Sequence, residues 1–149
     1  MKYALPFVLA GLLGGSLAAA EGDVPAPSSI FIEGDVEDLS QFVWKKRPIV
    51  VFADSPDDPN FDLQMEYFTE RIDELVERDV IVLTDTDPSV QSALRTKLRP
   101  RGFMLVLIGK DGSIKLRKPL PWDVRELSRT IDKNPTRQRE IRERRANDS

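Results

Sequence analysis

The chain has 149 residues, of which 25 are acidic and 22 are basic, and it contains no cysteine and no histidine. This length suits one compact domain with a sizeable core. The missing cysteine excludes thiol catalysis, disulfides and cysteine-ligated zinc, and the missing histidine removes the commonest general base and the commonest transition-metal ligand.

The charge is divided unevenly along the chain. Residues 21–94 include 5 basic and 18 acidic side chains, whereas residues 95–149 include 16 basic and 7 acidic ones. A dipolar chain of this kind can steer charged partners. The alternative, which we favour, is that the basic and acidic parts partly neutralise each other in the folded domain.

The N-terminus has the three parts of a secretory signal peptide. Lys2 precedes an apolar run from Tyr3 to Leu17, and three alanines ending at Ala20 precede the polar Glu21. We predict a signal peptide over 1–20 with cleavage after Ala20, a periplasmic or secreted location, and no stable membrane anchor after cleavage. An uncleaved anchor is the alternative, although the run is shorter than the ~20 apolar residues that span a bilayer.

A polar linker over 21–29, with two prolines, leads into the predicted domain at residues 30–145. Asp35 is expected to cap a short helix near the start of this domain. Trp44 is expected to pack as a lid over the core. Pro48–Ala53 is almost entirely apolar and predicts the first buried strand.

Two further helices each begin with an aspartate before a proline, a pattern typical of a helix cap. Asp58 precedes apolar residues at helical spacing from Phe61 to Val76, and the exposed face of this helix is acidic. Asp79–Thr84 predicts the second buried strand. Asp87 precedes a shorter helix whose apolar face begins at Val90.

A hairpin and two helices complete the domain. Phe103–Ile108 is an unbroken apolar run that predicts a strand buried on both faces, and Asp111-Gly112 predicts the tight turn after it. Residues 113–117 alternate polar and apolar, as in an edge strand. Trp122–Asp132 is typical of an amphipathic helix, and Pro135–Arg145 of a very polar one.

This order of elements predicts a thioredoxin-like α/β fold. Strands joined through a helix run parallel with a right-handed crossover, and a hairpin makes the last two antiparallel. We expect a three-layer α/β/α domain with a mixed four-stranded sheet in the order 2-1-3-4. An added C-terminal helix and a disordered tail over 146–149 follow it.

Four stretches of the chain then support a resemblance to a known family. They are LSQFVWKKRPIVVFA (39–53), ERDVIVL (77–83), LIGKDGSIKLR (107–117) and IDKNPTRQRE (131–140). In this order they resemble the bacterial domain of unknown function 4174, which is similar to the peroxiredoxin-like DUDES domain of animal extracellular proteins. The resemblance spans about residues 30–142.

The resemblance implies a thioredoxin-like fold and secretion, and it supplies no established activity and no catalytic residues. In thioredoxin-like and peroxiredoxin-like enzymes the reactive cysteine follows the first strand, where this chain has Asp54–Asn60. We therefore exclude thiol-redox activity. The chain has Asn-Pro-Thr-Arg at 134–137 where the family usually has Met-Pro-Met-Arg, so it lacks the methionines that the family would pack there.

Aspartates follow the two parallel strands, at the edge where α/β folds usually bind ligands. The candidate binding residues are Asp54, Asp57, Asp58, Asp85 and Asp87. Their oxygens suit a hard cation such as Ca²⁺, but the spacing matches no calcium loop. A basic protein segment is the more plausible ligand, and helix capping by Asp58 and Asp87 is the interpretation we favour. We predict no cofactor and no bound metal.

The basic part of the chain supplies a second candidate surface. Its members are Arg95, Arg99, Arg101, Arg137 and Arg139. They suit an acidic protein or an anionic component of the cell envelope. Nucleic acid is not expected, because the chain is predicted to be exported and its basic strands lack interleaved aromatic residues.

The sequence therefore predicts an exported thioredoxin-like domain without catalytic cysteine that acts as a non-enzymatic binding module. The alternative is a carboxylate- or cation-dependent enzyme with its site at the strand-end acidic loops. A third possibility is head-to-tail self-association of the acidic and basic parts.

Overall fold

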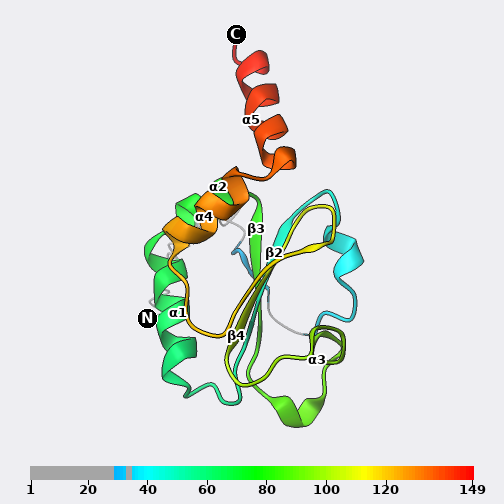
Figure 1. Ribbon diagram of the computed structural model, residues 1–149, viewed down its shortest axis with the longest axis vertical. Helices are drawn as coiled ribbons and strands as arrows, with labels where there is room; N and C mark the ends of the chain where they lie inside the picture. Colours follow the sequence, from blue (N-terminus) through cyan, green and yellow to red (C-terminus); the bar gives the residue numbers. More distant parts are fainter. Residues whose placement is uncertain (1–28, 33–34) are drawn as a thin grey trace, which may run out of the picture.

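The computed structural model describes residues 29–32 and 35–149, so the predicted signal peptide lies outside the described residues. The fold is built on a five-stranded mixed sheet in the order β1-β3-β2-β4-β5 (Figure 1). β2 pairs parallel with β3 and antiparallel with β4, and β4 pairs antiparallel with β5. These four strands and their order confirm the prediction. The strands are β1 Phe31–Ile32, β2 Arg47–Phe52, β3 Val80–Asp85, β4 Met104–Ile108 and β5 Ile114–Lys118.

The sheet has one strand more than predicted. β1 runs parallel to β3, with Phe31 opposite Val82, and the amide of Val82 donates to the carbonyl of Ile30 at 2.8 Å. A strand of two residues is too short to show an apolar run or an alternation, so the sequence pattern missed it. Because the two strands are parallel, the chain leaves β1 at the same edge of the sheet at which β3 ends.

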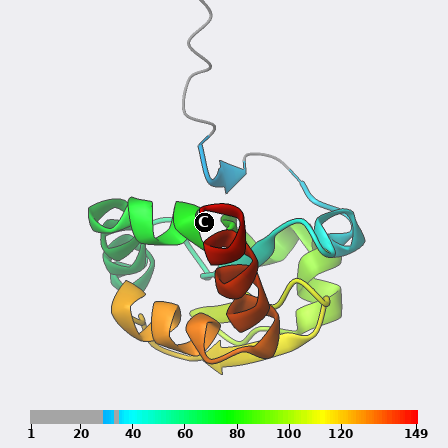
Figure 2. The ribbon, with the colours of Figure 1, turned by 90° about the horizontal axis from the view of Figure 1, so that it is seen from above.

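Helices cover both faces of the sheet, which confirms the three-layer architecture (Figure 2). One face is covered by α1 Pro59–Glu70, α2 Ile72–Glu77 and α4 Val124–Asp132. The other is covered by the 3-10 helix η1 Leu39–Phe42 and by α3 Ala93–Leu98. The first face is therefore covered by three α-helices, whereas the second is covered by one α-helix and one 3-10 helix.

β2 is buried on both faces, which explains its almost unbroken apolar sequence. Successive strand residues point to opposite faces. Accordingly, Ile49 and Val51 belong to the apolar cluster under α1, α2 and α4, whereas Val50 and Phe52 belong to the cluster under η1 and α3. All four side chains have 0% exposure.

The long helix predicted from Phe61 to Val76 is broken into α1 and α2. Arg71, at the break, has φ −129° and ψ 38°, outside the helical region. The break changes the direction of the chain, so Val76 is 52% exposed although its spacing predicted an inward position. The apolar spacing continues across the break, and for this reason spacing alone did not reveal it.

Two predicted helix starts are corrected. Asp38 rather than Asp35 caps η1, accepting a hydrogen bond from the amide of Ser40 at 2.8 Å. Asp87 caps a single 3-10 turn, η2 Pro88–Val90, rather than the following helix. Val90 is consequently 61% exposed and does not face the core.

Trp44 is 65% exposed, so the prediction that it packs as a lid over the core is wrong. Its backbone is left-handed, with φ 63°, and its amide donates to the carbonyl of Lys110 in the β4–β5 turn at 2.7 Å. In that turn Gly112 has φ 82°, whereas Asp111 is not left-handed. The turn therefore runs from Gly109 to Gly112 instead of centring on the Asp-Gly pair.

α5 Pro135–Asn147 is capped by Asn134, whose side chain accepts a hydrogen bond from the amide of Thr136 at 3.0 Å. The helix continues past the predicted end at Arg145 and projects away from the sheet (Figure 1). None of the helices that the structure describes is long and apolar enough to cross a membrane.

Candidate functional site

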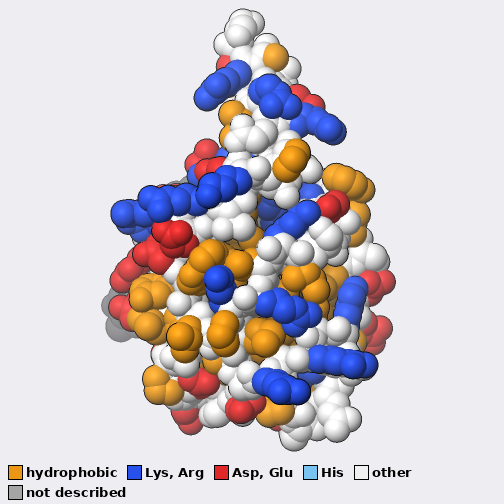
Figure 3. Space-filling view, viewed as in Figure 1, with side chains coloured by type: hydrophobic (Ala, Val, Ile, Leu, Met, Phe, Trp, Pro, Cys, Tyr) orange, Lys and Arg blue, Asp and Glu red, His pale blue; other side chains and the backbone are white. Residues whose placement is uncertain are grey.

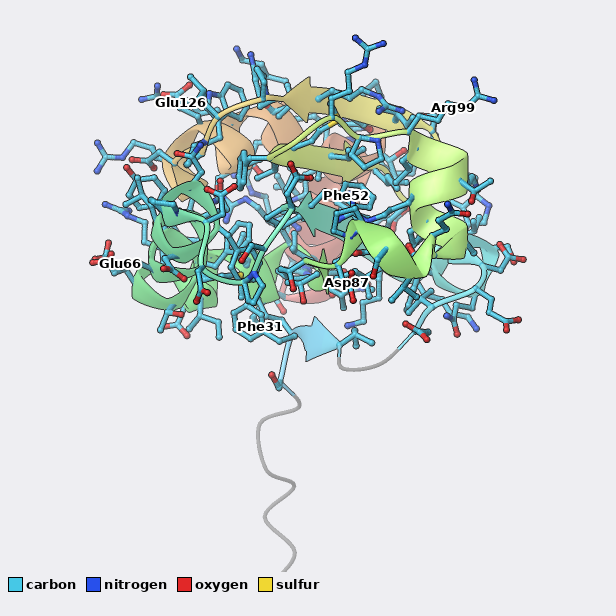
Figure 4. The ribbon with its side chains drawn as sticks, turned by 90° about the horizontal axis from the view of Figure 1, so that it is seen from below. Phe31, Phe52, Glu66, Asp87, Arg99 and Glu126 are labelled. Carbon is cyan, nitrogen blue, oxygen red and sulfur yellow. The ribbon has the colours of Figure 1, made fainter. Side chains whose placement is uncertain are left out.

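The predicted acidic loops lie at the carboxyl edge of β2 and β3 (Figure 4). Asp58 caps α1 by accepting from the amide of Asn60 at 2.9 Å. Asp87 caps η2 by accepting from the amide of Ser89 at 3.0 Å, and the Ser89 hydroxyl donates to the same oxygen at 2.6 Å. These hydrogen bonds lower the pKa of Asp87 below its ordinary value. Capping of neighbouring turns is therefore an observed role of both aspartates.

Asp85 is engaged in an ion pair with Arg95. The guanidinium Nε lies 2.9 Å from Asp85 Oδ1, with side-chain exposures of 10% and 12%, and the Ser92 hydroxyl donates to the other carboxylate oxygen. Arg95 also donates to the carbonyl of Ala53 at 2.7 Å and lies over the ring of Phe52. The prediction that Arg95 belongs to a basic surface is wrong, because its guanidinium fastens the end of β2 to the end of β3.

A groove of about 500 Å³ opens beside the end of β3. Of the predicted aspartates, only Asp85 and Asp87 line it, whereas Asp54 and Asp57 are exposed in the β2–α1 loop. Two further acids that the sequence analysis missed, Asp35 and Glu37, complete its acidic lining, and the apolar part is Val36, Val90 and Leu94.

The missed acids follow from the missed strand. β1 is parallel to β3, so the segment after β1 and the segment after β3 meet at one edge. Recognising Phe31–Ile32 as a strand would have placed Asp35 and Glu37 beside Asp85.

The geometry does not favour a cation at this edge. Among residues 29–32 and 35–149, no three acidic side chains gather closely enough to hold a metal ion. Hard cations such as Ca²⁺ require several oxygen ligands at short distance. Capping and ion pairing also occupy oxygens of Asp58, Asp85 and Asp87.

The predicted basic surface is divided by the structure. Arg99, Arg101 and Arg139 are exposed, and Figure 4 shows Arg99 at the rim of the domain. Arg137 is only 2% exposed, so its assignment to a surface is wrong. Its guanidinium is 3.3 Å from Glu140 and makes further ion pairs with Asp132 and Glu77, because the first turn of α5 packs against the domain.

Glu140 lies at the centre of an ion network at the opposite edge of the sheet. Its carboxylate receives two hydrogen bonds from Arg47, at 3.1 and 3.2 Å, and lies 2.7 Å from Lys110 Nζ. Burial opposes ionisation of Glu140, but hydrogen bonds from Lys110 and Arg47 outweigh it and lower the pKa to about 2. Lys110 also pairs with Asp79 at 2.8 Å.

The network gathers the four stretches that carry the family resemblance. Arg47 comes from 39–53, Asp79 from 77–83, Lys110 from 107–117 and Glu140 from 131–140. The sequence analysis assigned these residues no common role. A pairing over such sequence distances has no local spacing that could reveal it.

The fold is thioredoxin-like, and the loops that follow its strands contain no cysteine. The protein therefore belongs to a class of thioredoxin-like domains that have no cysteine for thiol chemistry. The chain belongs to the family described as "Domain of unknown function (DUF4174)", whose model matches residues 38–140, well over half of the chain. A comparison with curated proteins found no match.

A solved peroxiredoxin shares the fold, and a second one is similar in sequence over a comparable share of the chain. The reduced 2-Cys peroxiredoxin of Plasmodium vivax is 17% identical, with a TM-score of 0.52 over 63% of this chain and 80% of that chain. The mitochondrial 2-Cys peroxiredoxin of Plasmodium falciparum is 21% identical, with a TM-score of 0.45 over 64% of this chain and 79% of that chain. Because this chain contains no cysteine, it cannot perform the thiol chemistry of a 2-Cys peroxiredoxin.

Proposed function

We propose that this domain is an exported, non-enzymatic binding module whose groove beside β3 receives a basic segment of a protein partner. The observation that supports it is the composition of that groove, which is lined by four carboxylates and by three apolar side chains. Asp85 is held in the ion pair with Arg95 and Asp87 in its cap, so Asp35 and Glu37 are the acids of the groove that are left to meet a cationic group.

The size and lining of the groove suit side chains rather than a folded surface. A volume of about 500 Å³ lies within the range of small-ligand sites. Lys and Arg combine an apolar stem with a cationic head. In this groove the stem would contact Val36 and Leu94 while the head approaches Asp35 or Glu37.

Nothing in the groove favours the alternative enzyme. Catalysis by two carboxylates requires environments that separate their pKa values, with one raised to act as an acid. The pKa of Asp87 is instead lowered, by hydrogen bonds from Ser89. The binding module is therefore the function that the geometry supports best.

The test is calorimetric titration of the domain with a short peptide that alternates arginine and leucine. The variant is Asp35→Asn with Glu37→Gln, and the matched control is Asp54→Asn with Asp57→Asn, which removes the same charge outside the groove lining. We expect the groove variant to weaken binding about tenfold, equivalent to ~1.4 kcal/mol, and the control to weaken it less than twofold. Equal weakening by both pairs would show that only net charge matters.

Export is tested separately from binding. When the full chain is expressed in a Gram-negative host, we expect the protein in the periplasmic or medium fraction to have the mass of a chain beginning at Glu21. Protein that stays in the cytoplasm with residues 1–20 attached would contradict the predicted signal peptide.

A further inference from the structure

We propose that the outward face of α5 is a second binding surface, which takes an extended, flexible polyanion through three arginines. This surface is independent of the groove beside β3, from which it is separated by the length of the sheet (Figure 1). We call the three residues the arginine stripe: Arg139, Arg142 and Arg145.

α5 is fastened to the domain by its first turns. Arg137 and Glu140 lie on one side of the helix and enter the buried ion network. Arg144 follows on that same side and contacts the carbonyl of Glu77 at 3.4 Å. The side of the helix that faces the domain is therefore occupied, and the opposite side is left for a partner.

Arg139 and Arg142 lie on the opposite side, and Arg145 continues their row toward the flank of the helix. Residues three apart are neighbours on a helix surface, so Arg139, Arg142 and Arg145 form one row. With a rise of 1.5 Å per residue, this row extends over about 9 Å. All three side chains are exposed, and Figure 3 shows Lys and Arg side chains standing out from the projecting helix.

These arginines do not form ion pairs with the acids of the domain. Within the part of the chain that the structure describes, the stripe has no ion pair. Glu140 is turned into the domain by Arg47 and Lys110. Glu143, which lies one helical turn after Arg139, forms no ion pair with any of the three arginines.

A polyanion fits this surface better than a lipid bilayer does. The exposed face of α5 has no large apolar side chain to insert between lipids, because Ile141 is half-buried against the domain. Guanidinium groups bind phosphate and sulfate oxygens in a bidentate manner. A flexible polymer with closely spaced oxyanions can follow the row on the projecting helix.

Stabilisation of the helix alone does not account for the stripe. Cations in the last turn of a helix interact favourably with its dipole, and the effect is confined to that turn. Arg144 and Arg145 meet this condition. Arg139 and Arg142 lie earlier in the helix, so the helix dipole does not account for them.

The test is titration of the full chain with sodium polyphosphate, and in a second arm with dextran sulfate, at several salt concentrations. The stripe variant replaces Arg139, Arg142 and Arg145 with glutamine. The control replaces Lys97, Arg101 and Arg125, which are exposed elsewhere and remove the same total charge. We expect the stripe variant to bind at least tenfold more weakly, with a shallower salt dependence, and the control to stay within twofold.

Each outcome decides the proposal. The proposal is supported if the stripe variant, but not the control variant, loses binding of polyphosphate or of dextran sulfate. The polymer whose binding is lost shows whether the surface prefers phosphate or sulfate groups. Equal weakening by stripe and control variants, or no binding of either polymer to the unaltered chain, overturns it. Circular dichroism shows whether α5 persists in the stripe variant, and an Arg→Ala stripe variant repeats the test if the glutamine variant loses helix, because alanine has the highest helix propensity. The variant Asp35→Asn with Glu37→Gln should bind polyphosphate normally, which separates this result from the groove hypothesis.

Discussion

The two edges of the sheet use carboxylates in different ways. At the carboxyl edge, Asp58 and Asp87 accept from amides two residues further along the chain. At the opposite edge, Glu140 binds Arg47, which is 93 residues away in the sequence. One edge therefore uses its acids for local turns, and the other uses an acid to join elements that are remote in the chain.

This difference determines what each edge can offer a partner. Caps and the Asp85–Arg95 pair leave the acidic groove open, because they fix the backbone around it without filling it. The ion network joins β2, the β4–β5 turn and α5 through paired side chains, so its role is to hold these elements together. The comparison predicts that substitutions will cost more stability at the network than at the caps.

The largest effect is expected for Glu140→Gln. It leaves Arg47, which is 3% exposed, and Lys110, which is 11% exposed, without their shared carboxylate. Breaking a buried pair from one side typically costs about 3–5 kcal/mol. Urea unfolding should show this loss, whereas Glu143→Gln, on an exposed part of α5, should change the stability by less than about 0.5 kcal/mol. A small effect of Glu140→Gln would mean that water replaces the carboxylate.

The network also predicts how stability depends on pH. The pKa of Glu140 is about 2 in the folded domain and 4.5 ordinarily, so its contribution is complete above pH 4.5 and is lost as the pH falls toward 2. Urea unfolding at several pH values between 6 and 2.5 should show the unaltered chain approaching Glu140→Gln in stability as the pH falls. A constant difference between the two proteins across this range would contradict the assignment.

The sequence predicted the parts of the fold that depend on local patterns. The buried strands, the helix cap at Asp58 and the strand order all followed from apolar runs, turn residues and connection lengths. Trp44 did not, because its outward direction depends on a left-handed backbone tied to Lys110 in another turn. No local feature of the sequence shows whether an aromatic residue beside a strand points into the core or into solvent.

The site was only partly predictable for the same reason. Asp85 and Asp87 were placed at the correct edge by the parallel strands, but Asp35 and Glu37 were missed with the two-residue β1. Arg95 and Arg137 were assigned to a surface because charged residues are mostly exposed. Their burial depends on contacts that exist only in the folded chain, that of Arg95 with Ala53 at the end of β2 and that of Arg137 with Glu77.

The smallest effect is expected at the caps. Asp58→Ala removes the acceptor for the Asn60 amide at the start of α1 and should cost about 1 kcal/mol in urea unfolding. Asp87→Ala should cost less, because η2 is a single exposed turn whose ordering contributes little to the core. Asp58→Asn, which keeps an acceptor oxygen, is the control and should restore most of the loss. If Asp58→Ala cost as much as Glu140→Gln, the contrast between local and long-range carboxylates at the two edges would be wrong.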